Sequence, residues 1–281
     1  MRPPDVRTDR HSEVASKLQV RRDRACIQSR ATYCRRAIHL VRAASVVAFL
    51  SVGLADLNAA ETATLRVAEP TGDASRWTVE QMSGGTVTTR DGALIVDDAA
   101  GCTVWYNERI VAPVEISYDV TVVFKGGPHD RVSDVNCFWM AQDPRSDDRC
   151  PFTAQHGRSG KFSDYDSLFT YYVGMGGNEN TTTRFRRYNG TSNRPLLPEH
   201  DLRDPSVLLE ANRTYHIRLV ARDGVAEYWR DGKKLFSFDD PQPLTSGWFA
   251  IRTIHSHLEV RNLRVNSLNS AKTSAPSASA P

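Results

Sequence analysis

Basic side chains are concentrated between residues 157 and 194. This stretch holds six of them against three acidic residues, and the six are Arg158, Lys161, Arg184, Arg186, Arg187 and Arg194. An arginine guanidinium can bind a carboxylate through two parallel hydrogen bonds, so such a cluster favours an acidic ligand. For any single arginine, an exposed strand whose charges pair with neighbouring carboxylates is an equally good explanation.

Strand alternation indicates which of these side chains would share a face. If Phe185 points into a core, Arg184, Arg186 and Tyr188 project from the opposite side of the same strand. Tyr172 takes the same orientation on the preceding strand, where its hydroxyl is a candidate for taking or returning a proton.

Other residues near this face have the chemistry of sugar contacts. The Gly-rich stretch at 174–180 carries Asn178 and Asn180, whose amides can hydrogen-bond sugar hydroxyls. Trp139 could stack on a sugar ring, although an aromatic residue on a strand is more often part of the core. A plain hairpin loop would explain the glycines equally well.

Histidines offer a second source of proton-transfer groups. His255 and His257 flank Ser256 at an expected bend, and Arg252 lies three residues before His255. Alternate residues of an extended chain share a face, so both imidazoles could reach one cleft. The candidate catalytic residues are therefore Tyr172, His255, His257 and Arg252, although such a histidine pair is more often exposed or structural.

Several other chemistries lack their sequence pattern. Glu115 and Asp119 share a strand face, but no Glu-x-Asp-x-x-Glu string supplies the closely paired carboxylates of a retaining glycosidase. No C-x-x-C or histidine-rich spacing predicts a zinc site. We expect no metal among the catalytic residues and no cofactor.

The net charge of +3 comes from the N-terminal region. Residues 1–60 contain eleven basic and five acidic residues, which leaves 25 basic and 28 acidic residues in the remainder. A nucleic-acid partner needs a dense basic surface on the folded domain, so none is expected.

The first 60 residues resemble a leader. Three arginines precede a charge-free run at 43–55, which has the length of a signal-peptide apolar core and is short for a membrane span. We expect cleavage to leave a mature chain that begins between Asp56 and Ala63, is secreted or periplasmic and has no membrane partner, although an uncleaved anchor is the alternative. The domains predicted are the leader at 1–60, a β-domain at 61–268 and a disordered tail at 269–281.

Three cysteines follow the leader. Cys137 and Cys150 flank a loop that a disulfide could close, whereas Cys102 lies on an apolar strand and is expected to be a buried thiol.

A period of two dominates the chain after residue 76. It is clearest at 114–122, where apolar residues occupy every even position. Asp-Gly and Asn-Gly dipeptides separate such runs, as in tight hairpins. The predicted strands are 93–96, 102–106, 114–122, 135–140, 168–173, 182–188, 215–221, 226–229, 235–238, 248–254 and 258–265. This pattern favours an all-β antiparallel sandwich or jelly roll.

The C-terminal strands carry a more specific pattern. Four segments follow one another there. They are residues 212–220, the strand ending in Arg230-Asp231-Gly232-Lys233-Lys234-Leu235-Phe236, the segment Gly247-Trp248-Phe249 and the closing strand 257–265. This succession resembles the last hairpins of the concanavalin A-like lectin/glucanase superfamily, in an uncharacterised secreted bacterial branch associated with polysaccharide degradation. The resemblance covers about 76–266 and implies a jelly-roll sandwich; it also allows a structural calcium ion.

That resemblance leaves three classes of function open, because the fold serves lectins, hydrolases and lyases. The first, which the arginine, tyrosine and histidine candidates favour, is a polysaccharide lyase that acts by β-elimination on a uronate-containing glycan. The second is a non-catalytic carbohydrate-binding module, with a glycoside hydrolase of the same fold as a related alternative. The third is a structural or protein-interaction domain. A monomer that binds a polysaccharide or oligosaccharide is expected for the first two.

Overall fold

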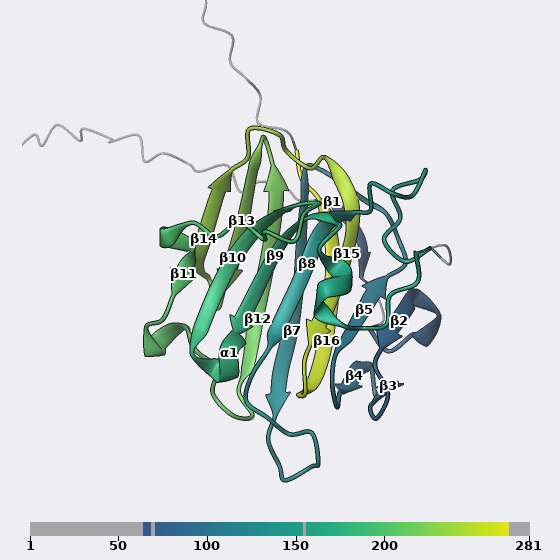
Figure 1. Ribbon diagram of the computed structural model, residues 1–281, viewed down its shortest axis with the longest axis vertical. Helices are drawn as coiled ribbons and strands as arrows, with labels where there is room; N and C mark the ends of the chain where they lie inside the picture. Colours follow the sequence, from purple (N-terminus) through teal and green to yellow (C-terminus); the bar gives the residue numbers. More distant parts are fainter. Residues whose placement is uncertain (1–63, 69–70, 154–155, 270–281) are drawn as a thin grey trace, which may run out of the picture. The chain divides into compact units, whose positions relative to one another are not determined.

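Alternating segments of the sequence form strands in the computed structural model of the protein, which describes residues 64–68, 71–153 and 156–269 (Figure 1). Every predicted strand is present, with ends that differ by a few residues. The predicted leader lies outside the described residues, as does the predicted tail apart from Asn269.

The strands form two antiparallel sheets. In the first, here called sheet A, neighbours follow the order β14-β13-β12-β7-β16-β4-β3, and β1 also pairs with β16. Its strands are β1 (Thr64–Ala68), β3 (Thr86–Arg90), β4 (Ala93–Asp97), β7 (Val114–Val123), β12 (Thr214–Arg222), β13 (Val225–Arg230), β14 (Lys233–Asp239) and β16 (His257–Ser267).

The second, sheet B, has the order β11-β10-β9-β8-β15-β5-β2, with β6 paired to β15. Its strands are β2 (Trp77–Gln81), β5 (Cys102–Tyr106), β6 (Ile110–Val111), β8 (Val135–Gln142), β9 (Phe169–Gly176), β10 (Thr182–Asn189), β11 (Asp201–Leu202) and β15 (Ser246–Thr253). The helical turns are α1 (Gly177–Asn180), η1 (Ala74–Arg76), η3 (Phe162–Tyr165), η4 (Pro198–His200) and η5 (Pro205–Val207).

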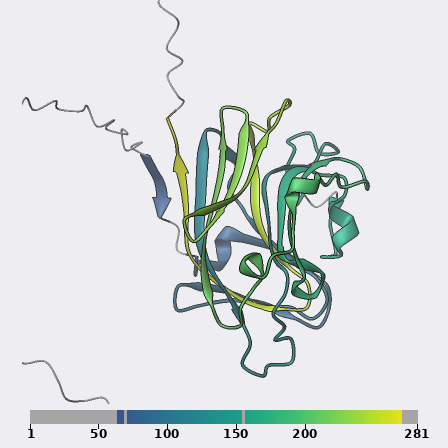
Figure 2. The ribbon, with the colours of Figure 1, turned by 90° about the vertical axis from the view of Figure 1, so that its left-hand side faces the viewer.

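The main core lies between the two sheets, which Figure 2 shows as two layers of strands. On β7 the even-numbered residues Ile116, Tyr118 and Val120 are buried in this core, as the alternation predicts. Tyr171 and Val173 of β9 face it from sheet B. The prediction of an antiparallel jelly-roll sandwich is therefore confirmed.

A second apolar cluster covers part of the outer face of sheet B. It contains Trp105, Phe138 and Tyr172, whose positions on their strands alternate with those of core residues. The described parts of the connection between β8 and β9, residues 143–153 and 156–168, pack over these rings through Tyr165 and Leu168. We call it the cover segment; it leaves open the part of the face beside β10 and α1.

Two predictions are corrected by this arrangement. Cys137 is in the main core while Cys150 is in the outer cluster, so the two lie on opposite sides of sheet B and remain free thiols, as does Cys102. Trp139 is fully buried in the main core and packs on Tyr171, so it is not available to stack on a sugar.

Candidate functional site

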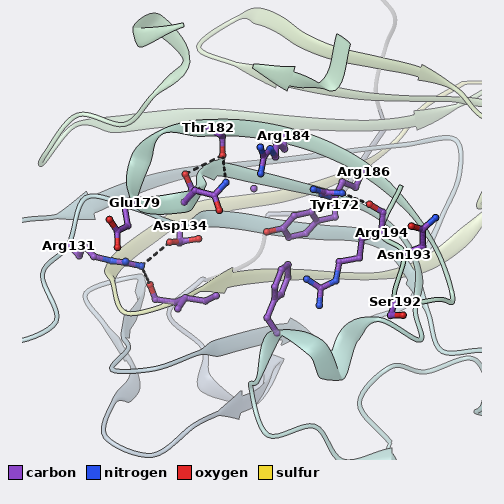
Figure 3. A pocket seen from close by; sticks show the side chains of 15 residues that line it. Arg131, Asp134, Tyr172, Glu179, Thr182, Arg184, Arg186, Ser192, Asn193 and Arg194 are labelled. Carbon is purple, nitrogen blue, oxygen red and sulfur yellow. Dashed lines mark hydrogen bonds and ion pairs between the residues drawn. The ribbon is translucent and has the colours of Figure 1, made fainter. Parts of the chain in front are cut away.

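A pocket with a volume of about 500 Å³ lies on the open part of the outer face of sheet B, over β9, β10 and α1. In Figure 3, Tyr172 occupies its middle, with Asp134 and Arg131 on one side and Arg186 and Arg194 on the other. The residues that line it are Arg131, Asp134, Phe162, Tyr172, Gly174, Gly177, Asn178, Glu179, Thr182, Arg184, Arg186, Ser192, Asn193, Arg194 and Ile254.

Strand register brings the predicted residues together. Tyr172 is opposite Arg186, and Gly174 is opposite Arg184. Residues that oppose each other on one face of a sheet are neighbours. Phe185, which lies between the two arginines, points into the main core. The predicted orientation of Arg184, Arg186 and Tyr172 is thus present.

Most of the arginines of the pocket have a carboxylate partner. The ion pairs are Arg131 with Asp134, at 2.9 Å, Arg184 with Asp201, at 2.8 Å, and Arg194 with Asp166. Arg184 binds both oxygens of Asp201, and this contact, aided by Arg203, holds the pKa of Asp201 down to about 2. Internal charge pairing therefore accounts for these three arginines.

Arg186 differs from the other three. Within the described residues it has no carboxylate partner, and its guanidinium donates instead to the backbone oxygen of Arg194. Partial burial lowers the pKa of Arg186, and the nearby positive charge of Arg184 lowers it further. Arg186 is thus the arginine of the pocket whose charge no carboxylate of the described residues balances.

Tyr172 contributes a hydroxyl that has no hydrogen-bond partner among the described residues. Its ring is held between Phe138, at a centroid distance of 5.1 Å, and Phe162, at 5.7 Å. A Cβ atom on Gly174 would lie 2.8 Å from this hydroxyl, so the phenol fits because residue 174 has no side chain. Burial raises the pKa of Tyr172 well above its usual value, so the hydroxyl stays protonated near neutral pH.

The α1 turn forms one wall of the pocket. Asn178 and Glu179 adopt the left-handed conformation, with φ of 52° and 57°, which is costly for residues other than glycine. The amide of Asn178 donates to the hydroxyl of Thr182 at 3.0 Å, and both side chains line the pocket. Exposed Asn178 retains hydrogen-bonding capacity for a polar ligand.

Neither histidine of the predicted catalytic pair lines the pocket. Nδ1 of His255 lies 2.9 Å from the backbone oxygen of Ala99, and Nδ1 of His257 lies 2.9 Å from Asp130. Both rings are thus held by the loops that follow β4 and β7 rather than grouped with Tyr172. None of the described residues that line the pocket is a histidine.

Three other predicted residues lie beside the pocket without lining it. Arg252 is buried between the rings of Phe162 and Tyr165. Tyr188 is buried against Tyr172. Asn180 is occupied with both the backbone nitrogen and oxygen of Leu209, so it holds a loop rather than facing a ligand.

Arg131, Asp134 and Phe162 also line the pocket, although their sequence positions did not predict this. Arg131 reaches the pocket because it donates to the backbone oxygens of Ile254 and His255, a contact across a long sequence separation. Phe162 is an aromatic residue within a polar connection, which is the signal that could have marked it.

The described residues do not fit a metal site. No three His, Cys, Asp or Glu side chains among them are grouped so as to hold an ion, and the calcium ion that the resemblance allows stays a prediction. Among the helices of the same residues, none is long and apolar enough to cross a membrane.

A solved structure with a galectin-like fold supports the sandwich fold. A Bacillus subtilis protein of unknown function with a galectin-like fold matches with a TM-score of 0.58 and 17% identity, over 74% of this chain and 97% of the other. A carbohydrate-binding module, CBM66, from Bacillus subtilis matches with a TM-score of 0.46 and 11% identity, over 68% of this chain and 96% of the other. An endo-β-1,3-glucanase from Pyrococcus furiosus matches with a TM-score of 0.47 and 9% identity, over 75% of this chain and 96% of the other.

Sequence comparison identifies the family. Comparison with curated proteins gives no match. A family model described as a domain of unknown function, DUF6250, matches residues 96–263, which span the strands from β4 to β16 and include the pocket. The chain therefore belongs to the DUF6250 family.

Proposed function

We propose that this protein is an exported carbohydrate-binding protein that recognises an acidic saccharide in the pocket beside Tyr172. The single observation that carries this is Arg186, a partly buried guanidinium without a carboxylate partner in the described chain. A uronate supplies both the carboxylate that such a cation prefers and the hydroxyls that Asn178 can bind. Export rests on the leader, and the galectin-like sandwich is consistent with a sugar ligand.

Replacing Arg186 by methionine tests this function. The change removes the charge but keeps an extended apolar side chain, so affinity for a uronate oligosaccharide should fall about ten- to a hundredfold. Isothermal titration with oligogalacturonate measures it, and Arg90→Met on exposed β3 of sheet A is the matched control. An Arg186→Met variant that binds every uronate as well as the parent protein would exclude this pocket.

A second candidate is β-elimination at the same pocket, favoured by the unpaired hydroxyl of Tyr172. In that reaction a base removes the proton beside the uronate carboxylate, and the departing glycosidic oxygen gains a proton. The raised pKa of Tyr172 suits the proton donor rather than the base. Of the two acids that line the pocket, Asp134 is already bound to Arg131 and Ser133, and Glu179 is exposed on the α1 turn. Binding without turnover is therefore the better supported function.

Tyr172→Phe distinguishes these two functions. It keeps the ring between Phe138 and Phe162 but deletes the hydroxyl. If the protein only binds, affinity should change by less than about threefold, and neither form should produce the absorbance of an unsaturated uronate. Absorbance that grows with the parent protein and disappears in Tyr172→Phe would instead establish elimination.

A further inference from the structure

Arg252 is a buried cation whose hydrogen-bonding capacity is largely unused. Its side chain is 1% exposed. Nη1 donates to the hydroxyl of Thr103 at 2.8 Å and to the backbone oxygen of Gly160 at 3.0 Å, but Nε and Nη2 have no partner among the described residues. Buried polar atoms are almost always paired, so this guanidinium requires an explanation.

The unpaired atoms are the two that bind a carboxylate most effectively. In this same protein Arg184 uses Nε and Nη2 to hold both oxygens of Asp201, and Arg145 uses them to hold Asp143. On Arg252 this edge is held in a fixed orientation, because Nη1 is bonded and two aromatic rings lie 4.8 Å from the guanidinium carbon. The edge is thus preorganised for a carboxylate.

Strand register connects this edge to the pocket. Arg252 is opposite Asn136, Asn136 is opposite Gly174, and Gly174 is opposite Arg184. Arg252 and Arg184 are therefore three strands apart in one row, roughly 14 Å. Gly174, which lines the pocket, adds no side chain to this row, and Oδ1 of Asn136 is also buried without a partner. Because the hydroxyl of Tyr172 lies over Gly174, the row is a strip of polar groups that runs from Arg184 in the pocket to Arg252.

Phe162 separates the two ends of the strip. Its ring lines the pocket, lies 4.8 Å from the guanidinium carbon of Arg252 and 4.2 Å from that of Arg194. The ring packs on Tyr172 and is itself half-buried, so Phe162 lies between the pocket and the guanidinium of Arg252.

We infer that Arg252 is the carboxylate-binding group of an inner subsite, which Phe162 covers and which takes a second uronate unit of the saccharide bound beside Arg186. This inference rests on the proposed function. It makes the ligand an oligosaccharide with acidic groups on separate units. It also gives Arg252 a role in specificity for a saccharide with several carboxylates.

The test compares a galacturonate trimer with its carboxyl-reduced form in titrations of the mature protein. Arg252→Lys keeps the buried charge but lacks the two-donor edge, so affinity for the uronate trimer should fall about tenfold. The weaker binding of the reduced trimer should not change. Arg261→Lys, which alters an arginine that binds Glu259 through the same two atoms on sheet A, should leave both affinities unchanged.

A second variant tests the cover independently of affinity. In Phe162→Ala, phenylglyoxal should modify Arg252, as read by peptide mass spectrometry, and the uronate trimer should protect it. Two results would overturn the inner subsite and leave the proposed function intact. One is an Arg252 that stays unmodified in Phe162→Ala. The other is an Arg252→Lys protein that binds the uronate trimer normally while Arg186→Met does not. A parent protein that binds no uronate would overturn both.

Discussion

A side chain at position 174 would collide with the hydroxyl of Tyr172. The 2.8 Å between that oxygen and an added Cβ is shorter than a tolerated contact, and two ring carbons lie at 3.3 Å. Gly174→Ala should therefore displace the phenol and destabilise the fold by about 1–2 kcal/mol. Uronate affinity should also fall, because the phenol is next to Arg186 in the register. Thermal unfolding and titration measure the two effects.

Removing the hydroxyl should relieve the collision. The double variant Gly174→Ala with Tyr172→Phe should regain most of the lost stability, because the closest contact involves the deleted oxygen. Additive losses in the double variant would mean that Gly174 matters for another reason, such as its backbone conformation.

At the same scale, the sequence predicts which side chains of the site share a face but not which of them form ion pairs. Alternation was enough to put Arg184, Arg186 and Tyr172 on one face, because a period of two needs no knowledge of the tertiary fold. Alternation could not predict that Arg184 has a carboxylate partner whereas Arg186 has none among the described residues. The difference depends on Asp201, a residue of another strand that reaches Arg184 and not Arg186.

At the scale of elements, the cover segment contains a buried ionic cluster. Asp143 is fully buried and binds Arg145 at 2.7 Å as well as Arg158, whose side chain is 2% exposed. Burial by itself would raise the pKa of Asp143, but hydrogen bonds from Arg145 and Arg158 hold it to about 2. Because this pKa is below the unfolded value, the cluster stabilises the protein above about pH 4, and this contribution is lost as the pH falls towards 2.

Asp143→Asn should loosen the cover segment, because it leaves the Arg158 charge buried without its counter-charge. We expect a loss of about 3 kcal/mol at neutral pH, with faster amide hydrogen exchange in residues 143–153 and 156–168. The difference from the parent protein should shrink as the pH falls from 4 to 2. Asp147→Asn, an exposed change in the same segment, is the control, and equal exchange in both variants would contradict the role of Asp143.

Strands were easier to predict than the segments that cover them. The predicted strands place apolar residues in the main core, whereas the missed β3 has an exposed or half-buried residue at every position. The other missed strands include β6 and β11, which are two residues long and too short to show a period. The cover segment has no period either, because its contacts with Trp105 and Phe138 come from scattered aromatic side chains.

At the scale of the whole molecule, two apolar clusters on either side of sheet B, rather than a disulfide, connect the described elements. The main core spans both sheets, and the outer cluster anchors the cover segment to sheet B. Spacing in the sequence suggested a bridge between Cys137 and Cys150 because it could not show that the sheet lies between them. Packing of this extent makes a covalent link unnecessary for a domain of about 200 residues.

The state of the three thiols provides the last prediction. Burial raises the pKa of Cys102, Cys137 and Cys150, that of Cys137 to about 12, so very little of the reactive thiolate is present at neutral pH. Iodoacetamide should therefore label none of the three in the folded protein and all three in denaturant without a reductant. A reductant should leave the melting temperature unchanged, whereas loss of a native bridge would cost about 2–4 kcal/mol. Peptide mapping that finds Cys137 joined to Cys150, or unlabelled in denaturant until a reductant is added, would contradict the separation of these thiols by sheet B.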